Sequence, residues 1–320
     1  MDYRLLGRTC LNVSVLGYGA SPLGGVFGPV DEAEGTRCVH AALDGGVNLL
    51  DVSPFYGNTT AETRLGAALR GVVREGYYLS TKVGRYGDTD FDFSRTRVLR
   101  SLDESLARLG TDYVDIILCH DIEFGDLDQI VGETLPALRQ AVAQGKARFV
   151  GVSGLPLLVL DYVAQQVPLD VVLSYCHYTL SDTSLAEYTP GFAKRGSGVI
   201  NASPLGMGLF TDSPLPPWHP APPVLREACA RAGDLCRTRG ANFADLALSF
   251  SVRAPYAACT LVGCDDAKQM LRNIVAIQNP PDPELLEDVR DILRPVWNLS
   301  WPSGKPENRT MRKERQAETL

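Results

Sequence analysis

The sequence predicts a TIM barrel, a closed barrel of eight parallel strands inside a ring of helices, on three observations. Eight short runs of apolar, β-branched or aromatic residues recur along the 320-residue chain. Helix-like segments lie between these runs. The runs are almost wholly apolar, as in parallel strands that are buried on both faces. The expected strands are residues 13–19, 47–51, 77–84, 113–120, 147–154, 170–175, 197–204 and 259–264.

A doubly wound open sheet is the alternative α/β fold. The turn after the first run reads GYGASP, however, and lacks the G-x-G-x-x-G dinucleotide fingerprint of that fold. The intervening segments carry helix signals, such as Ser94 as an N-cap and Pro136 as the cause of a kink or a late start. The expected helices are residues 31–46, 94–110, 126–145, 242–253 and 265–276.

Three stretches lie outside the strand–helix repeat. The first residues predict a short hairpin around Gly7 and Arg8 that closes the bottom of the barrel. Residues 210–223 form a long Pro-rich loop, and a loop of this length inside a domain is usually functional. We expect a single domain over residues 1–304, including an extra C-terminal helix. Residues 305–320 are charged and without periodicity, which predicts a disordered tail.

Composition excludes several classes of protein. The net charge is −7 and no basic block occurs before the last residues, so nucleic acid is not an expected partner. No run approaches the roughly 20 apolar residues of a membrane helix. The first residues show no basic region followed by a long apolar core, so we do not expect a secretory signal. The eight cysteines and four histidines are scattered, which disfavours a metal site. Several cysteines lie in apolar runs, where a thiol usually behaves as a small apolar side chain, and this fits a reducing, cytoplasmic location.

Reactive side chains end three successive strands. The second run ends at Asp51, the third reaches Lys82 and the fourth ends at His120, while Tyr56 follows in the loop after Asp51. Neighbouring strands lie about 4.8 Å apart, so these side chains can meet at the mouth of the barrel. Taken singly, each residue has an ordinary explanation, such as a turn, a surface charge or a structural histidine. Together they predict a proton-transfer centre.

Elementary acid–base chemistry gives this group a function. A lysine cation favours the phenolate of a nearby tyrosine, whose pKa is otherwise about 10. Asp51 supplies the partner that a buried Lys82 requires, and His120 can orient a substrate oxygen. Neither a metal site nor a covalent nucleophile is evident. The expected reaction is therefore proton transfer by Tyr56 coupled to hydride transfer to a nicotinamide.

Six stretches resemble the aldo-keto reductase family: LLDVSPFYG, LSTKVG, YVDIILCHD, GKARFVGVSG, ASPLGMGL and LVGCDDAKQMLRN. The resemblance covers nearly all of residues 1–276. It implies that Tyr56 is the general acid–base, that Lys82 and Asp51 tune it, and that His120 positions the substrate oxygen. Asp121, Phe91 and Trp218 are further candidate substrate contacts, because they lie in loops above the expected mouth, although Trp218 could instead hold its own Pro-rich loop together.

Within that family, the chain is most similar to the plant-type L-galactose dehydrogenases. The shared stretches are CHDIEF, DLDQIVGETLP, LSYCHY, ASPLGMGL, PPWHPAPP and NLSWPSG. The resemblance implies oxidation of L-galactose at C1 to L-galactono-1,4-lactone with NAD, as in ascorbate biosynthesis. We expect a monomer or weak homodimer. The alternatives are an enzyme for another aldose, aldehyde or ketone, and a nucleotide-binding regulatory barrel such as a potassium-channel β subunit.

The cofactor pocket departs from the usual family pattern. Ser153-Gly154 stands where many members have Ser-Asn, Tyr175 replaces a glutamine, and Ala202 replaces an aromatic residue, so we expect Tyr175 to supply ring contact. Asp265 and Asp266 stand where NADP-dependent members carry a basic residue, which favours NAD. The cofactor-binding residues implied by the resemblance are Gly19, Ala20, Ser21, Asp51, Ser153, Gly154, Tyr175, Ser203, Pro204, Leu205, Gly206, Gly208, Gly263, Asp265, Gln269 and Asn273.

Overall fold

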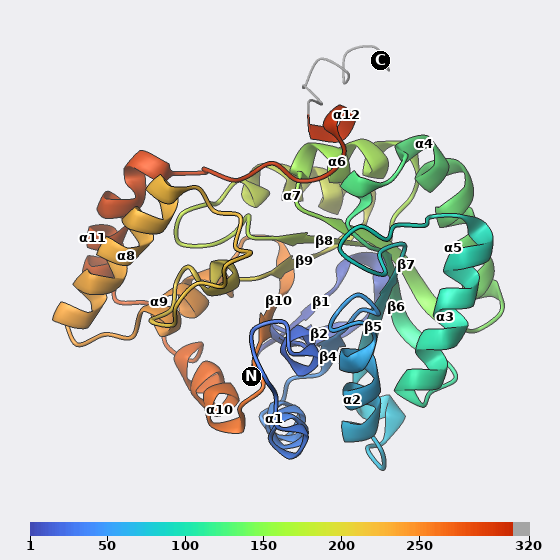
Figure 1. Ribbon diagram of the computed structural model, residues 1–320, viewed down its shortest axis with the longest axis horizontal. Coiled ribbons are helices and arrows are strands. Elements are labelled where there is room, and N and C mark those ends of the chain that lie inside the picture. Colours follow the sequence, from blue (N-terminus) through green and yellow to red (C-terminus); the bar gives the residue numbers. More distant parts are fainter. Residues whose placement is uncertain (310–320) are drawn as a thin grey trace.

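The computed structural model describes residues 1–309 and confirms the predicted barrel (Figure 1). Eight strands pair in parallel in the closed order β10-β3-β4-β5-β6-β7-β8-β9, with β9 returning to β10. Each expected strand is present. The barrel strands are β3 (Leu16–Gly19), β4 (Leu49–Asp51), β5 (Tyr78–Val83), β6 (Val114–Cys119), β7 (Ala147–Gly154), β8 (Val171–Tyr175), β9 (Gly198–Ala202) and β10 (Ala257–Gly263).

Helices surround the barrel, and their buried faces pack on the outward-facing side chains of the strands. The five expected helices are present, and the structure adds further helices that we did not predict individually. Figure 1 shows α8 and α11 packed side by side outside the ring. The helices are α1 (Glu32–Asp44), α2 (Thr60–Ala68), α3 (Arg95–Leu109), α4 (Leu127–Gln129), α5 (Leu135–Ala143), α6 (Leu157–Gln166), α7 (Leu185–Arg195), α8 (Pro223–Thr238), α9 (Phe243–Ser251), α10 (Ala267–Ala276), α11 (Pro283–Leu293) and α12 (Pro306–Arg309).

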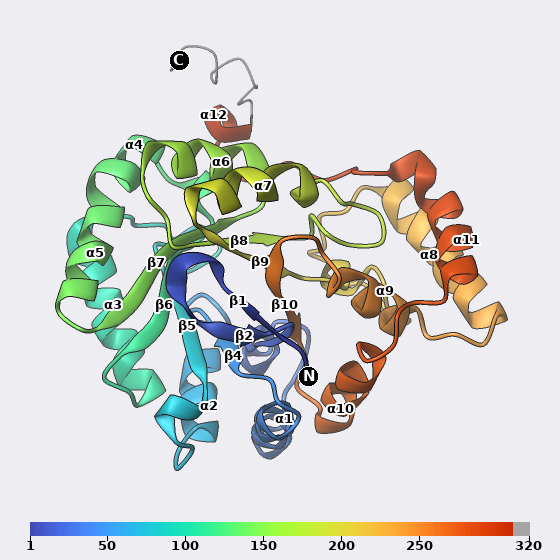
Figure 2. The same cartoon turned by 180° about the vertical axis from the view of Figure 1, so that it is seen from behind.

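The predicted N-terminal hairpin lies across the bottom of the barrel (Figure 2). Strands β1 (Tyr3–Leu5) and β2 (Asn12–Ser14) pair antiparallel. Leu6, between them, is fully buried in the same apolar cluster as barrel-interior residues such as Leu49. Gly7 lies so close to the start of β9 that an added Cβ would be 2.3 Å from the backbone nitrogen of Gly198. The hairpin therefore fills the end of the barrel opposite the strand termini that carry the reactive residues.

Two element boundaries differ from the expected ones. The run over residues 13–19 is not one strand, because it is divided between β2 of the hairpin and β3 of the barrel. The amide of Ser14 donates to the side chain of Asn48 (2.7 Å) at this point. The expected helix over 126–145 is interrupted by a π-helical turn at Ile130–Thr134, where the amide of Leu135 donates to Ile130. Pro136 follows directly and lacks the N–H that a regular helix needs.

The two remaining segments also take defined positions. No helix or strand interrupts residues 209–222, so the Pro-rich loop is present as expected, and α8 begins at Pro223. The predicted disordered tail begins at residue 305, but Pro306–Arg309 form the short helix α12. The amide of Lys305 donates to the backbone oxygen of Glu123 (2.9 Å), and Nδ2 of Asn308 donates to the same oxygen (2.7 Å). The rest of that predicted tail lies outside the described residues.

Candidate active site

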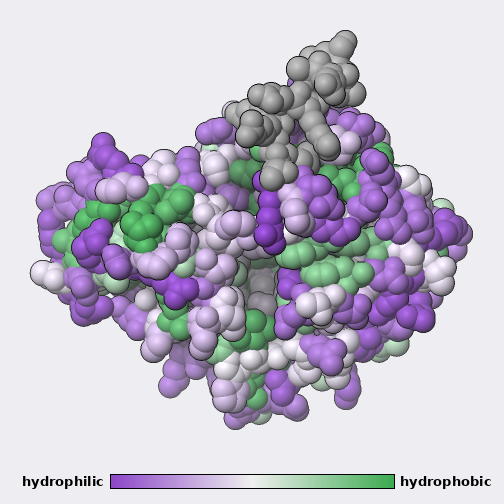
Figure 3. Space-filling model, turned by 45° about the horizontal axis from the view of Figure 1, so that its top comes forward, coloured by the Kyte–Doolittle hydropathy of each residue, from purple (hydrophilic) through white to green (hydrophobic). Residues whose placement is uncertain are grey.

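The site lies at the carboxyl end of the barrel strands. Along each strand, alternate side chains face the barrel interior, and Leu49, Leu118 and Leu173 belong to the interior apolar cluster. The residues two positions further on face the same way at the mouth. This alternation brings together Gly19, Asp51, Lys82, His120, Ser153, Tyr175, Ala202 and Gly263, all of them expected site positions apart from Ala202. The space-filling view shows that the surface is hollowed near the centre of this side of the molecule (Figure 3).

Asp51 and Lys82 form a buried ion pair at the centre of this mouth. The Lys82 ammonium contacts Oδ1 of Asp51 and donates to the backbone oxygen of Val52 (2.9 Å). The hydroxyl of Ser80 donates to Oδ2 of Asp51 (2.7 Å). Burial acts to lower the pKa of Lys82, but Asp51 and Tyr56 outweigh it and hold that pKa above its ordinary value. Lys82 is therefore a fixed cation.

Tyr56 lies beside this cation, as expected. Its ring centre is 4.9 Å from Nζ of Lys82, and its loop packs closely on Gly24, whose oxygen would be 2.1 Å from a Cβ added to Gly57. Burial raises the pKa of Tyr56, and Lys82 offsets part of that rise. Lys82 therefore acts in the expected direction, but the net pKa of Tyr56 lies above its ordinary value. Burial is the larger effect, and the side chain is a neutral phenol.

His120 completes the group. Its ring meets that of Tyr56 edge to face, with centroids 5.7 Å apart, and Nδ1 forms a hydrogen bond with the hydroxyl of Ser53 (2.9 Å). Burial, reinforced by the positive charges of Lys82 and Arg85, holds its pKa well below the usual range. The imidazole is therefore neutral. The Asp121 carboxylate lies 3.7 Å from Nε2, which favours the tautomer that carries its proton there.

Several residues around this group were missed by the sequence analysis. Arg85 follows β5 and pairs with Asp121, with Nη1 of Arg85 2.5 Å from Oδ2 of Asp121. Its guanidinium lies over the ring of Phe55, 3.7 Å from the centroid. The expected substrate contact Phe91 is close by and stacks on Phe124, with centroids 4.6 Å apart. An arginine in a strand-following loop looks like a surface charge in the sequence, and only its neighbours show otherwise.

Glu123 explains one departure from the family pattern. Its carboxyl lies against Gly154, where an added Cβ would be 2.5 Å from Oε2 of Glu123. A larger residue at position 154 would therefore clash with it. Oε1 accepts hydrogen bonds from the amide of Leu155 (3.1 Å) and the hydroxyl of Ser303 (2.8 Å), whereas Oε2 has no partner among residues 1–309. Burial, and next the Asp121 carboxylate, raises the pKa of Glu123 to about 8.

This raised pKa predicts how stability depends on pH. Glu123 loses its proton near pH 4.5 when unfolded but near pH 8 when folded, so its stabilising protonation is fully present below pH 4.5 and is lost above about 8. As pH rises between these values, Glu123 should lower the free energy of unfolding of the wild type by up to about 1.4 kcal/mol per pH unit. This contribution should be absent in Glu123→Gln. Urea unfolding from pH 5 to 8 measures this difference. The exposed substitution Glu287→Gln should keep the wild-type slope, and equal slopes in all three proteins would refute the assignment.

Most of the expected cofactor residues belong to three segments, which follow the neighbouring strands β3, β9 and β10. Gly19, Ala20 and Ser21 join β3 to the following turn, and the amide of Ala20 donates to the oxygen of Asp51 (2.8 Å). The loop after β9 turns sharply, with positive φ at Ser203 and Gly206. The remaining expected residues of this loop are Pro204, Leu205 and Gly208.

The third cofactor segment is the start of α10. Gly263 ends β10, the half-buried Asp265 follows, and the amide of Gln269 donates to Asp266 (2.7 Å), which caps the helix. Nδ2 of Asn273 is buried and has no partner among residues 1–309. An unsatisfied buried donor at this place fits an acceptor atom of a bound group, such as a ring nitrogen of adenine. These residues would therefore suit the adenosine end of a dinucleotide.

The ring contacts of Trp218 are with Phe27 and His219, and not with the tetrad formed by Asp51, Tyr56, Lys82 and His120. Its side chain is 49% exposed and its ring packs on Phe27, with centroids 5.8 Å apart. Phe27 belongs to the loop after β3 and Trp218 to the Pro-rich loop after β9, so the two loops meet. This position fits the expected alternative role of Trp218 in holding its loop.

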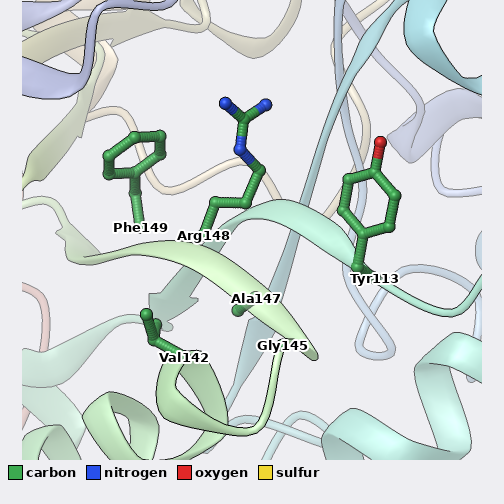
Figure 4. A pocket seen from close by; sticks show the side chains of 6 residues that line it. All are labelled: Tyr113, Val142, Gly145, Ala147, Arg148 and Phe149. Atoms are coloured by element: carbon green, nitrogen blue, oxygen red, sulfur yellow. The ribbon is translucent and has the colours of Figure 1, made fainter.

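Other features lie away from the mouth. A shallow cavity of about 570 Å³ lies at the opposite end of β6 and β7 and is lined by Tyr113, Val142, Gly145, Ala147, Arg148 and Phe149 (Figure 4). It contains no member of the tetrad. Within residues 1–309 no cluster of three or more potential ligands is arranged around a metal site. None of the helices in the same residues has the length and apolarity needed to cross a membrane.

Several known proteins are similar to this chain over most of its length. Residues 15–294 match the model of the aldo/keto reductase family. An L-galactose dehydrogenase of Arabidopsis thaliana is 47% identical over 96% of this chain and 99% of its own length. A D-arabinose 1-dehydrogenase of Saccharomyces cerevisiae is 30% identical over 83% of this chain and 86% of its own. The fold matches that of an aldo-keto reductase of Bacillus halodurans in its holo form, with 24% identity, a TM-score of 0.77 and coverage of 97% of this chain and 99% of the other. This chain is a member of the aldo/keto reductase family.

Proposed function

We propose that this chain is an NAD-dependent dehydrogenase that oxidises C1 of L-galactose to L-galactono-1,4-lactone. The observation that carries the proposal is the buried Asp51–Lys82 pair beside Tyr56 and His120 at the barrel mouth. The relative named L-galactose dehydrogenase, at 47% identity over nearly the full length, supports the choice of sugar. Eight free cysteines fit the cytoplasmic location that we predict, and a monomer or weak homodimer remains our expectation.

The four side chains divide the chemistry among them. Tyr56 takes the proton of the anomeric hydroxyl as C1 is oxidised, and Lys82, held by Asp51, stabilises the phenolate that this step requires. The neutral His120 donates a hydrogen bond from Nε2 to the same substrate oxygen and so fixes its position. A bound nicotinamide supplies the hydride acceptor. The catalytic proton is transferred at the Tyr56 oxygen.

The proposed cofactor is NAD, because acidic side chains stand at the adenosine end. Asp265 would repel the 2′-phosphate of NADP, and Glu34 lies close to the same helix terminus, where its carboxylate accepts from the amide of Ala267 (2.9 Å). At the nicotinamide end we propose that Ser153 and Tyr175 contact the ring. Tyr175 pairs in register with Ala202, whose small side chain leaves space there.

The Asp265→Asn variant tests the choice of cofactor. Removing one carboxylate should tighten NADPH binding by about tenfold, because a charge–charge repulsion of about 1.4 kcal/mol is lost. NADH binding should change little, since NADH has no phosphate at that position. Titration of reduced-nicotinamide fluorescence measures both dissociation constants. Asp44→Asn, an exposed carboxylate on α1, is the matched control. Unchanged NADPH affinity in Asp265→Asn would contradict the proposed role.

Absorbance of the reduced nicotinamide tests the proposed reaction. The wild-type protein should reduce NAD in the presence of L-galactose, and it should do so more slowly with other aldoses. Turnover only with another aldose would move the proposal to that sugar. If the protein reduces simple aldehydes with NADH but oxidises no aldose, the result would favour the alternative of an enzyme that acts on another aldehyde or ketone. Nucleotide binding without any turnover would favour the regulatory barrel.

A further inference from the structure

Arg85 is held over the barrel mouth by the geometry of its loop. Gly84 has φ +99°, and a Cβ there would be 2.3 Å from the ring of Phe93, so the chain turns sharply as β5 ends. Arg85 then forms an antiparallel bridge with Phe91, which folds the loop back on itself. The loop therefore directs Arg85 toward the tetrad rather than away into solvent.

Aromatic rings surround the guanidinium. Its central carbon is 3.7 Å from the ring centre of Phe55, 5.3 Å from that of Phe91 and 5.6 Å from that of Phe124. The ring of Phe55 is in turn 5.9 Å from those of Tyr56 and His120. A guanidinium stacks well on aromatic faces and is weakly hydrated, so it stays in a partly buried place. Its side chain is 17% exposed.

Asp121 lies on the other side of Arg85 and directly follows His120. Its backbone has φ 49° and ψ 58°, a left-handed conformation that a residue other than glycine adopts at some cost in energy. This conformation places the carboxylate between two groups, 2.5 Å from Nη1 of Arg85 and 3.7 Å from Nε2 of His120. The pair is thus adjacent to the atom that would hold the reacting oxygen.

The pair keeps hydrogen-bonding capacity after these contacts. Arg85 donates through Nη1 to Asp121 and through Nε to the oxygen of Gly87 (3.4 Å), but Nη2 has no partner among residues 1–309. Oδ1 of Asp121 likewise has no partner in that part of the chain. One ion pair, packed against aromatic rings, therefore retains both a free donor and a free acceptor. A simple aldehyde has no groups to satisfy them, whereas each sugar hydroxyl both donates and accepts.

We propose that Arg85 and Asp121 together bind two neighbouring hydroxyl groups of the sugar, and that this pair makes the site selective for aldoses over simple aldehydes. Arg85 donates to one hydroxyl oxygen and Asp121 accepts from the adjacent hydroxyl. The ring of Phe55 packs against the C–H face of the sugar. The inference rests on the proposed oxidation of an aldose and adds the residues that select the substrate.

The test compares two substrates in Arg85→Lys, Arg85→Met and Asp121→Asn. For L-galactose oxidation, KM should rise by about 10- to 100-fold in Arg85→Met, because hydrogen bonds to a charged group are lost. Reduction of propanal with NADH, a substrate without hydroxyl groups, should keep its KM within about twofold. Arg85→Lys keeps the positive charge but not the planar donor fork, so it should fold normally and still show most of the loss in L-galactose binding.

Two further readouts separate binding from folding. The NADH dissociation constant, from fluorescence, should stay within about twofold of wild type in all three variants. Arg148→Met is the matched control, because Arg148 also pairs with a buried aspartate, Asp115 (2.7 Å), and lies near a ring, Phe149, but at the opposite end of the barrel. Its kinetic constants should equal those of the wild type.

Monodeoxy analogues of L-galactose locate the contact. Removal of the contacted hydroxyl should raise KM in the wild type and have no further effect in Arg85→Met. The inference would be overturned if the effects of every deoxy analogue and of Arg85→Met were independent and additive. An equal rise in KM for propanal and L-galactose in the variants would also overturn it, as would an unchanged KM for L-galactose. If wild-type protein reduces propanal but oxidises no aldose, the proposed function itself fails, and the inference fails with it.

Discussion

Replacing Tyr56 with phenylalanine is expected to lower kcat for aldose oxidation by about 10³-fold, within the range typical of a lost general acid–base. The ring remains, so its packing against His120 and Lys82 is kept and only the proton-transferring oxygen is removed. Binding of NADH should be unchanged. Tyr178→Phe is the matched control, because that half-buried tyrosine stacks on Phe250 outside the tetrad. Turnover of Tyr56→Phe close to that of wild type would contradict the assignment.

The direction of the Tyr56 pKa adds a dependence on pH. Burial raises that pKa, so the neutral phenol predominates in the free protein at neutral pH. Oxidation needs the phenolate and should therefore accelerate as pH rises. Reduction uses the phenol as an acid and should be fastest near or below neutrality. The profile of kcat/KM against pH, measured in both directions, reports this difference. Parallel profiles in the two directions would argue against proton transfer by Tyr56.

Lys82→Met is the second substitution with a large expected effect. It leaves the Asp51 carboxylate buried without its cation, and breaking such a pair typically costs about 3–5 kcal/mol of stability. It also removes the charge that stabilises the Tyr56 phenolate, so activity should fall with stability. Urea unfolding and steady-state kinetics measure the two losses separately.

A second variant separates these two roles of Lys82. Asp51→Asn combined with Lys82→Met leaves no unpaired charge, so much of the lost stability should return. Activity should not return, because the cation is still absent. Lys146→Met breaks an exposed pair with Asp103 and should cost at most about 1 kcal/mol. Recovery of activity in the double variant would show that Lys82 acts only on stability.

The convergence of Asp51, Lys82 and His120 was predictable because it depends on periodicity alone. Parallel strands in a closed barrel end at one face, and side chains two positions apart point the same way. The hairpin around Gly7 was predictable for a similar reason, since an open barrel bottom must be covered by apolar residues. These features follow from local patterns and from one rule of topology.

What the sequence did not predict depends on contacts between segments that are far apart in the chain. Arg85 gains its role from Phe55 and Asp121, which come from two other loops. Glu123 is separated by 185 residues from Asn308, and the hydrogen bond between them holds the start of the segment that was expected to be a disordered tail. The net rise in the pKa of Tyr56 was not predicted, because the extent of burial cannot be read from spacing. Loop conformation and burial, rather than strand order, account for these errors.

Transfer of deuterium from C1 of the sugar is the most direct measurement of the proposed reaction. L-Galactose carrying deuterium at C1 is incubated with NAD and the protein, and the NADH formed is analysed by mass spectrometry. The proposed mechanism predicts NADH that carries the deuterium, together with a slower rate than with unlabelled sugar where hydride transfer limits turnover. Unlabelled NADH would show that the hydride leaves another carbon, and absence of NADH would contradict the proposed oxidation itself.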